Sequence, residues 1–164
     1  MKYVSVPKQA SQDEVTLYCF MGEAMCSIQH VEAALNCAIT IKLNSEATRE
    51  VADEFLSKHR RYTLGKAIKI SADEKIFVES LQNELNDFLQ ERNWLVHNAI
   101  FENKEDLRVE SVMIKLFQRI KSISNKAQAL QHEIELDMLD FCKSKGRDMP
   151  NIRALVDEQY KKVE

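Results

Sequence analysis

Hydrophobic residues recur along most of the chain at alternating steps of three and four positions, the spacing of helices that pack nearly parallel to their neighbours. The clearest series follows Ser11 and Glu14, whose spacing is that of a capping box at the start of a helix. It predicts a first helix that runs to about Leu43. Its apolar positions are Leu17, Met21, Ala24, Ile28, Val31, Leu35 and Ala38.

A shorter helix is expected next, followed by a segment without clear periodicity. Ser45 is a suitable N-cap for this second helix, which ends near the basic stretch 58–61. Residues 62–70 mix apolar and basic side chains around Gly65, a residue type that often marks a break in regular structure. We expect this segment to form a connector.

Two more long helices and a short one complete the pattern. Ser71 and Glu74 have capping-box spacing and predict the start of a third long helix. A fourth long helix is expected from about Val109 to the stop signal Gly146, and Asn151 is suited to cap a short last helix. The pattern predicts an all-α fold, an up-and-down bundle of four to five helices with long first, third and fourth helices.

Length and composition fit one helical domain. The chain has 164 residues, of which 45% are hydrophobic, enough to build one sizeable core. With 3 glycines and 2 prolines, little in the sequence interrupts regular structure. We expect a single domain over residues 1–164, with its core at about 11–145.

Cysteine usage and hydropathy indicate a cytoplasmic protein with no membrane segment. The cysteines form no Cys-x-x-Cys pair and have no histidines at zinc spacing, so we expect reduced core thiols rather than metal ligands. No run approaches the ~18 apolar residues of a membrane span, and the first residues lack the apolar core of a signal peptide. The cysteines are Cys19, Cys26, Cys37 and Cys142.

The third long helix places a charged residue on its apolar face. On a helical wheel Arg92 falls in the middle of the apolar stripe. A buried guanidinium is costly without an anionic partner, so we expect a carboxylate, preferably Glu32 of the first helix, to pair with it. Asn93 and His97 share the next flank, and Trp94 lies on the far side, where a subunit interface would cover its indole. The stripe consists of Val78, Leu81, Leu85, Phe88, Val96 and Ala99.

The same helix resembles the HEPN superfamily, whose R-x4-H signature is matched by the run Arg92-Asn93-Trp94-Leu95-Val96-His97. The resemblance implies a homodimer in which two motifs face one cleft and cleave RNA through its own 2′-hydroxyl, without a metal or cofactor. It also implies that His97 acts as general base or acid, that Arg92 stabilises charge on the phosphoryl oxygens and that Asn93 orients the phosphate or His97. Toxins and antiviral-defence proteins of this superfamily act on RNA, with an antitoxin or regulatory protein as a further partner.

One residue departs from the toxin pattern. HEPN toxins that pair with a nucleotidyltransferase antitoxin often carry a tyrosine two residues after the histidine, and this chain has Ala99 there. The difference argues against regulation by tyrosine modification.

A second candidate feature is the basic segment 57–70, which contains no acidic residue. Because the net charge of the chain is -3, any surface that binds nucleic acid must be local. These cations suit an RNA backbone, with one tyrosine as a ring for base stacking, and they equally suit a helix end and a solvated connector. The residues predicted to bind RNA are Lys58, Arg60, Arg61, Tyr62 and Lys66.

Other functions stay open from the sequence. The main alternative to a nuclease is a non-catalytic HEPN-like module for dimerisation or for binding a nucleotide or partner protein. A plain helical bundle would need Arg92 only for an ion pair and would leave His97 on the surface. The sequence lacks a Gly-rich phosphate loop, a Gly-x-Ser-x-Gly elbow and a His-Glu-x-x-His helix, which excludes the commonest nucleotide-hydrolase, esterase and metalloprotease classes.

Overall fold

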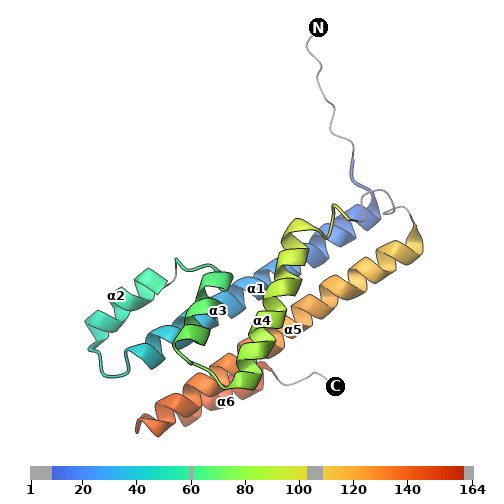
Figure 1. Ribbon diagram of the computed structural model, residues 1–164. Coiled ribbons are helices and arrows are strands. Elements are labelled where there is room, and N and C mark those ends of the chain that lie inside the picture. The colour runs from blue at the N-terminus through green and yellow to red at the C-terminus, as the bar shows by residue number, and fades with distance from the viewer. Residues whose placement is uncertain (1–8, 60, 103–108, 161–164) are drawn as a thin grey trace.

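The computed structural model describes residues 9–59, 61–102 and 109–160, and these residues form six α-helices and no strand (Figure 1). The predicted all-α class is therefore confirmed. The number of helices is six rather than four or five, because the segment expected to be a connector is itself helical. The helices are α1 (Gln12–Leu43), α2 (Arg49–His59), α3 (Leu64–Asp73), α4 (Glu79–His97), α5 (Glu110–Ser144) and α6 (Pro150–Gln159).

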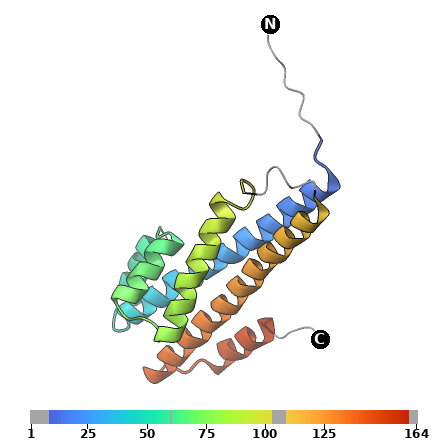
Figure 2. The same cartoon turned by 45° about the vertical axis from the view of Figure 1, so that its right-hand side comes forward.

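The two longest helices, α1 and α5, lie side by side and run in the same direction (Figures 1 and 2). Helix α4 runs the opposite way and packs against α5 and α3. The short helices α2 and α3 pack on α1, and α6 packs on α5. Figure 2 shows α6 on the side of α5 away from α4.

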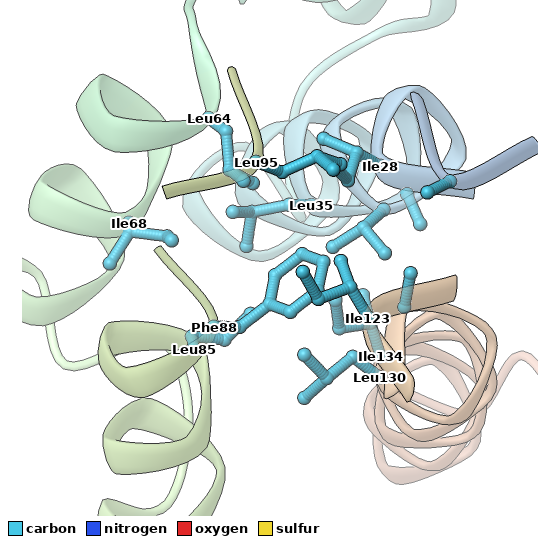
Figure 3. Close-up of a cluster of buried hydrophobic side chains, with 14 of the residues drawn as sticks. Ile28, Leu35, Leu64, Ile68, Leu85, Phe88, Leu95, Ile123, Leu130 and Ile134 are labelled. Carbon is cyan, nitrogen blue, oxygen red and sulfur yellow. The ribbon is translucent and has the colours of Figure 1, made fainter. Parts of the chain in front are cut away.

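The core lies between α1, α3, α4 and α5 (Figure 3). Most of the α1 series predicted from sequence is buried, with Leu17, Val31 and Leu35 at 1% exposure or less, while Met21 is half-buried. Ser27 and Ser124 form a polar contact within the α1–α5 seam, with their hydroxyl oxygens 3.1 Å apart. The residues labelled in Figure 3 are Ile28, Leu35, Leu64, Ile68, Leu85, Phe88, Leu95, Ile123, Leu130 and Ile134.

The ends of the two long helices follow local sequence signals. The Ser11 hydroxyl accepts from the Glu14 amide, and the Glu14 carboxylate accepts from the Ser11 amide, so the capping box is confirmed. Helix α5 is continuous and ends before Gly146, whose φ of 78° favours glycine. These signals act within one turn of the chain, which is why the sequence predicts them correctly.

Helix α3 corrects two predictions. Thr63 caps it by accepting from the Lys66 amide, and buried Leu64, Ala67 and Ile68 face the core, so residues 62–70 are not a connector. Ser71 does not begin the next helix: it is buried inside α3 and donates to the Ile68 carbonyl. The packing of α3 against α1 outweighs the local preference of Ser71 and Glu74 to begin a helix.

Helices α2 and α4 also begin later than predicted. Ser45 lies in a turn, and α2 begins at Arg49. Helix α4 begins at Glu79. Between α3 and α4, Lys75 has a φ of 50°, and the next two residues, Ile76 and Phe77, bury their side chains in the core.

Lys42 ties the end of α1 to two other parts of the fold. Its ammonium group donates to the Ile76 carbonyl at 3.0 Å, forms an ion pair with Asp137 of α5 and lies 4.9 Å from the centre of the Phe77 ring. Only 10% of the Lys42 side chain is exposed, so solvent screens this pair weakly.

Membrane insertion and disulfide bonding find no support among the described residues. None of the helices there is both long and apolar enough to cross a bilayer. All four cysteines are free thiols, but only Cys142 is buried; Cys19 and Cys26 are exposed, so the prediction of core thiols was wrong for these two.

Candidate functional site

The segment 92–97 forms the last turns of α4, where Arg92 occupies a position on the helix's buried seam. The buried residues of that helix face, together with Ala99 two residues after the helix, recur at steps of four, three, seven and four positions. Arg92 lies in the seven-residue gap, between Phe88 and Leu95. Val96 and Val78 were assigned to the stripe from the sequence, but they are 41% and 64% exposed. The buried members are Leu81, Leu85, Phe88, Leu95 and Ala99.

Arg92 is half-buried and only partly hydrogen-bonded. Its Nη1 donates to Asn93 Oδ1 at 3.1 Å, whereas its Nε is buried and has no hydrogen-bond partner among the described residues. An unpaired buried N–H of a cation is costly, so this atom marks a place where an acceptor would bind favourably.

Glu32 does not pair with Arg92, contrary to the sequence prediction. Its carboxylate accepts from the backbone N–H of Leu64 at 2.6 Å, at the start of α3. The free amides and the positive dipole end of α3 attract this carboxylate. Because α3 was not expected to be a helix, the competing partner was not visible in the sequence.

His97 is the last residue of α4 and is exposed. The five-residue separation places it about 140° around the helix from Arg92. The guanidinium therefore lies toward the core seam and the imidazole lies at the surface. Within one chain the two groups are on different flanks of α4.

Trp94 is covered by its own chain, which corrects the expectation that a subunit interface covers it. The Arg119 guanidinium carbon lies 3.5 Å from the centre of a Trp94 ring, and the indole N–H donates to Glu102 at 2.8 Å. Arg119 also donates to both carboxylate oxygens of Glu91, at 3.1 and 3.3 Å. This cluster fixes the last turn of α4 against α5, and no periodicity of the sequence identified its members.

The basic segment surrounds the turn between α2 and α3. Lys58, Arg61 and Lys66 are exposed. Lys66 places its ammonium group 4.0 Å from the centre of the Tyr62 ring, and His59 lies against the same ring at 5.0 Å, so the tyrosine predicted to stack on a base already has two neighbours. Arg60 lies outside the described residues.

The basic segment and the motif are connected through α3. A β-carbon added to Gly65 would lie 3.6 Å from the Leu89 side chain, so the first turn of α3 packs against α4 about one turn before Arg92. The cations of the α2–α3 turn and the motif helix therefore belong to neighbouring parts of the fold.

No family model, curated protein or solved structure matches this chain. Its chemistry must therefore be inferred from its own residues. Among the described residues, no group of three or more histidines, cysteines or carboxylates is arranged to hold a metal ion. In the part of the chain that the structure describes, one hollow lies between α1, α5 and α6 and another between α3 and α4, and neither of these is lined by Arg92, Asn93 or His97.

The buried His59 predicts a stability that depends on pH. Its Nδ1 lies 2.7 Å from Thr40 Oγ1, and burial, followed by the positive charge of Lys58, lowers the pKa of His59 from its ordinary value of 6.5. Below pH 6.5 the unfolded chain therefore binds more protons than the folded one, so stability is full above that pH and decreases as the pH falls.

We expect the thermal midpoint to decrease as the pH is lowered from about 7.5 to about 5.5, roughly the range in which a histidine with an ordinary pKa titrates in the unfolded chain. His59→Asn should reduce the dependence, while the same change at exposed His30 should leave it intact. A midpoint equally pH-dependent in His59→Asn would show that another group is responsible.

Proposed function

We propose that this protein is a HEPN-type, metal-independent endoribonuclease whose composite R-x4-H site forms between two copies of the chain. The observation that carries the proposal is Arg92, a cation on a buried helix seam with an unpaired Nε, five residues before exposed His97. A phosphate oxygen is an acceptor that satisfies such a donor and balances its charge.

The proposed chemistry assigns one role to each motif side chain. His97 accepts the proton of the RNA 2′-hydroxyl or returns one to the leaving 5′-oxygen, a role suited to an imidazole near neutral pH. Arg92 stabilises the negative charge that develops on the phosphoryl oxygens. Asn93 accepts from Arg92 through its carbonyl oxygen, which leaves its amide N–H groups to donate to the phosphate.

A second copy of the chain supplies the geometry that one copy lacks. Because Arg92 and His97 lie on different flanks of α4, a symmetric partner is needed to bring a second motif to the same cleft. The end of the molecule that holds the end of α4, the start of α1 and the start of α5 also carries exposed apolar side chains (Figure 1). These are Val15, Tyr18, Val96, Phe101, Val109 and Ile114.

The basic side chains of the α2–α3 turn would hold the RNA backbone beyond the cleft. Lys58, Arg61 and Lys66 are exposed and close to α4 through the first turn of α3. We place this activity in the cytoplasm and in a toxin–antitoxin or antiviral-defence setting, where an antitoxin or regulatory protein restrains it.

Replacing His97 tests this function directly. Purified protein incubated with total RNA in EDTA should cleave it, and His97→Ala should lower the initial rate by about 100-fold or more, since proton transfer supplies an effect of this order. The matched control is His30→Ala, an exposed histidine of α1 outside the motif. Equal rates for wild type and His97→Ala would remove the motif from the reaction.

A non-catalytic dimerisation module is the second candidate. It is favoured by the Trp94–Arg119 cluster, which occupies one flank of the motif helix, and by the absence of motif residues from the two hollows. Sedimentation at micromolar concentration separates the cases together with the RNA assay. A dimer without turnover supports the module, and a monomer contradicts both candidates.

A further inference from the structure

A polar hollow lies between α1, α5 and the end of α6. Figure 2 shows that α6 is on the side of α5 away from α4. Its volume is about 340 Å³, within the size range of small-molecule sites. The residues that line it come from three helices, and each carries a polar or sulfur-containing side chain. A gap between packed helices is ordinarily filled by aliphatic side chains, so this lining calls for a polar occupant.

Three of the groups that line the hollow have oxygens that can accept a hydrogen bond from an occupant. Ser27 donates its hydroxyl proton to the Glu23 carbonyl at 3.0 Å, and Gln131 donates its amide to Glu135 at 2.8 Å. Each is left with an oxygen that accepts. The Glu23 carboxylate adds a formal negative charge, held by the Ser124 hydroxyl at 3.5 Å.

Among the described residues, no lysine or arginine lines this hollow. The Glu135 carboxylate accepts the hydrogen bond from Gln131. The histidine that lines the hollow is His30 of α1. The hollow therefore presents a carboxylate and neutral acceptors to its occupant. A cation that donates hydrogen bonds complements such a lining, whereas an anion would meet repulsion from Glu23.

Helix α6 forms one wall of the hollow and is weakly attached. None of its residues is buried, and it is held to α5 by the Arg153–Asp140 ion pair and by the stacking of Tyr160 on His132 at 4.3 Å. Burial, followed by the charge of Glu135, raises the pKa of Tyr160, so its hydroxyl keeps its proton. This wall of the hollow therefore presents the uncharged aromatic side chain of Tyr160, at the end of a helix that has few tertiary contacts.

We propose that the α1–α5–α6 hollow binds a small organic amine in its ammonium form, through Glu23 and Gln131, and that the bound amine joins α6 to α1. The ammonium donates to the Glu23 carboxylate and to the Gln131 carbonyl. Because Gln159 of α6 lines the same hollow, the bound amine also contacts the last helix and holds it in place, which reduces its opening.

The test uses ¹⁵N-labelled full-length protein and three probes of equal chain length: 1,4-diaminobutane, 1,4-butanediol and succinate. We expect saturable shifts in backbone amides 23–30, 128–131 and 155–160 with the diamine alone. Slower hydrogen exchange in 150–160 should accompany them. Lack of saturation by about 50 mM, weaker than a ligand of this size should bind, or an equal response to the diol or succinate, would overturn the proposal.

Two variants assign the binding to the named groups. Glu23→Gln should weaken diamine binding about tenfold or more, because it removes the charge and keeps the shape. Gln131→Met, which removes the acceptor, should weaken it as well. The matched control is Glu133→Gln, an exposed carboxylate of α5 that does not line the hollow and should leave binding unchanged. Unchanged binding in Glu23→Gln would contradict the site whether or not the chain cleaves RNA.

Discussion

Arg92→Leu should abolish RNA cleavage and make the protein more stable. Leucine would complete the buried series of α4 between Phe88 and Leu95, and it would remove a guanidinium whose Nε has no partner among the described residues. We expect the rate of metal-free cleavage to fall by about 100-fold or more, and the free energy of unfolding to rise by roughly 1–2 kcal/mol. Urea unfolding and the RNA assay measure the two effects.

Replacing a residue that serves the site should lower the cleavage rate and raise the free energy of unfolding. Replacing a residue that stabilises the fold should lower the free energy of unfolding. The control is Arg49→Leu, which removes an exposed arginine of α2 that is 4.0 Å from Asp53 and should change neither quantity appreciably. A loss of stability in Arg92→Leu would mean that the guanidinium stabilises the fold. Retained cleavage would exclude Arg92 from the reaction.

Phe88→Ala should cause the largest loss of stability of any single change considered. The Phe88 side chain is fully buried, and Figure 3 shows its ring extending from α4 toward the seam of α1 and α5. Removing it leaves a cavity that three helices line, so we expect the free energy of unfolding to fall by about 3–5 kcal/mol. That is a large part of the roughly 5–15 kcal/mol typical of one domain.

Urea unfolding at one fixed protein concentration measures this loss, because association would otherwise shift the apparent stability. Leu155→Ala provides the control, since Leu155 of α6 is 65% exposed and its truncation should cost less than about 0.5 kcal/mol. A comparable loss in both variants would contradict the packing of α4 against α5 and α3.

The candidate site was predicted in part from the sequence. The position of Arg92 among buried residues follows from helical spacing, and so does the separation of about 140° between Arg92 and His97. The assignments that failed concern partners: Glu32 binds the Leu64 amide, and Trp94 stacks on Arg119. A partner depends on which helices meet and how each is rotated about its axis, and neither is encoded within one turn of sequence.

In the fold, too, some features were determined by the local sequence and others only by tertiary packing. Local chemistry along the chain set the helical class, the capping box at Ser11, the stop at Gly146 and the apolar seams of α1 and α5, because helix formation and capping depend on residues within about one turn. Tertiary packing decided that residues 64–73 are helical, that Ser71 is buried rather than a cap, and that Lys42 pairs with Asp137. These outcomes depend on burial against a distant helix, whose free energy outweighs the small differences in local propensity.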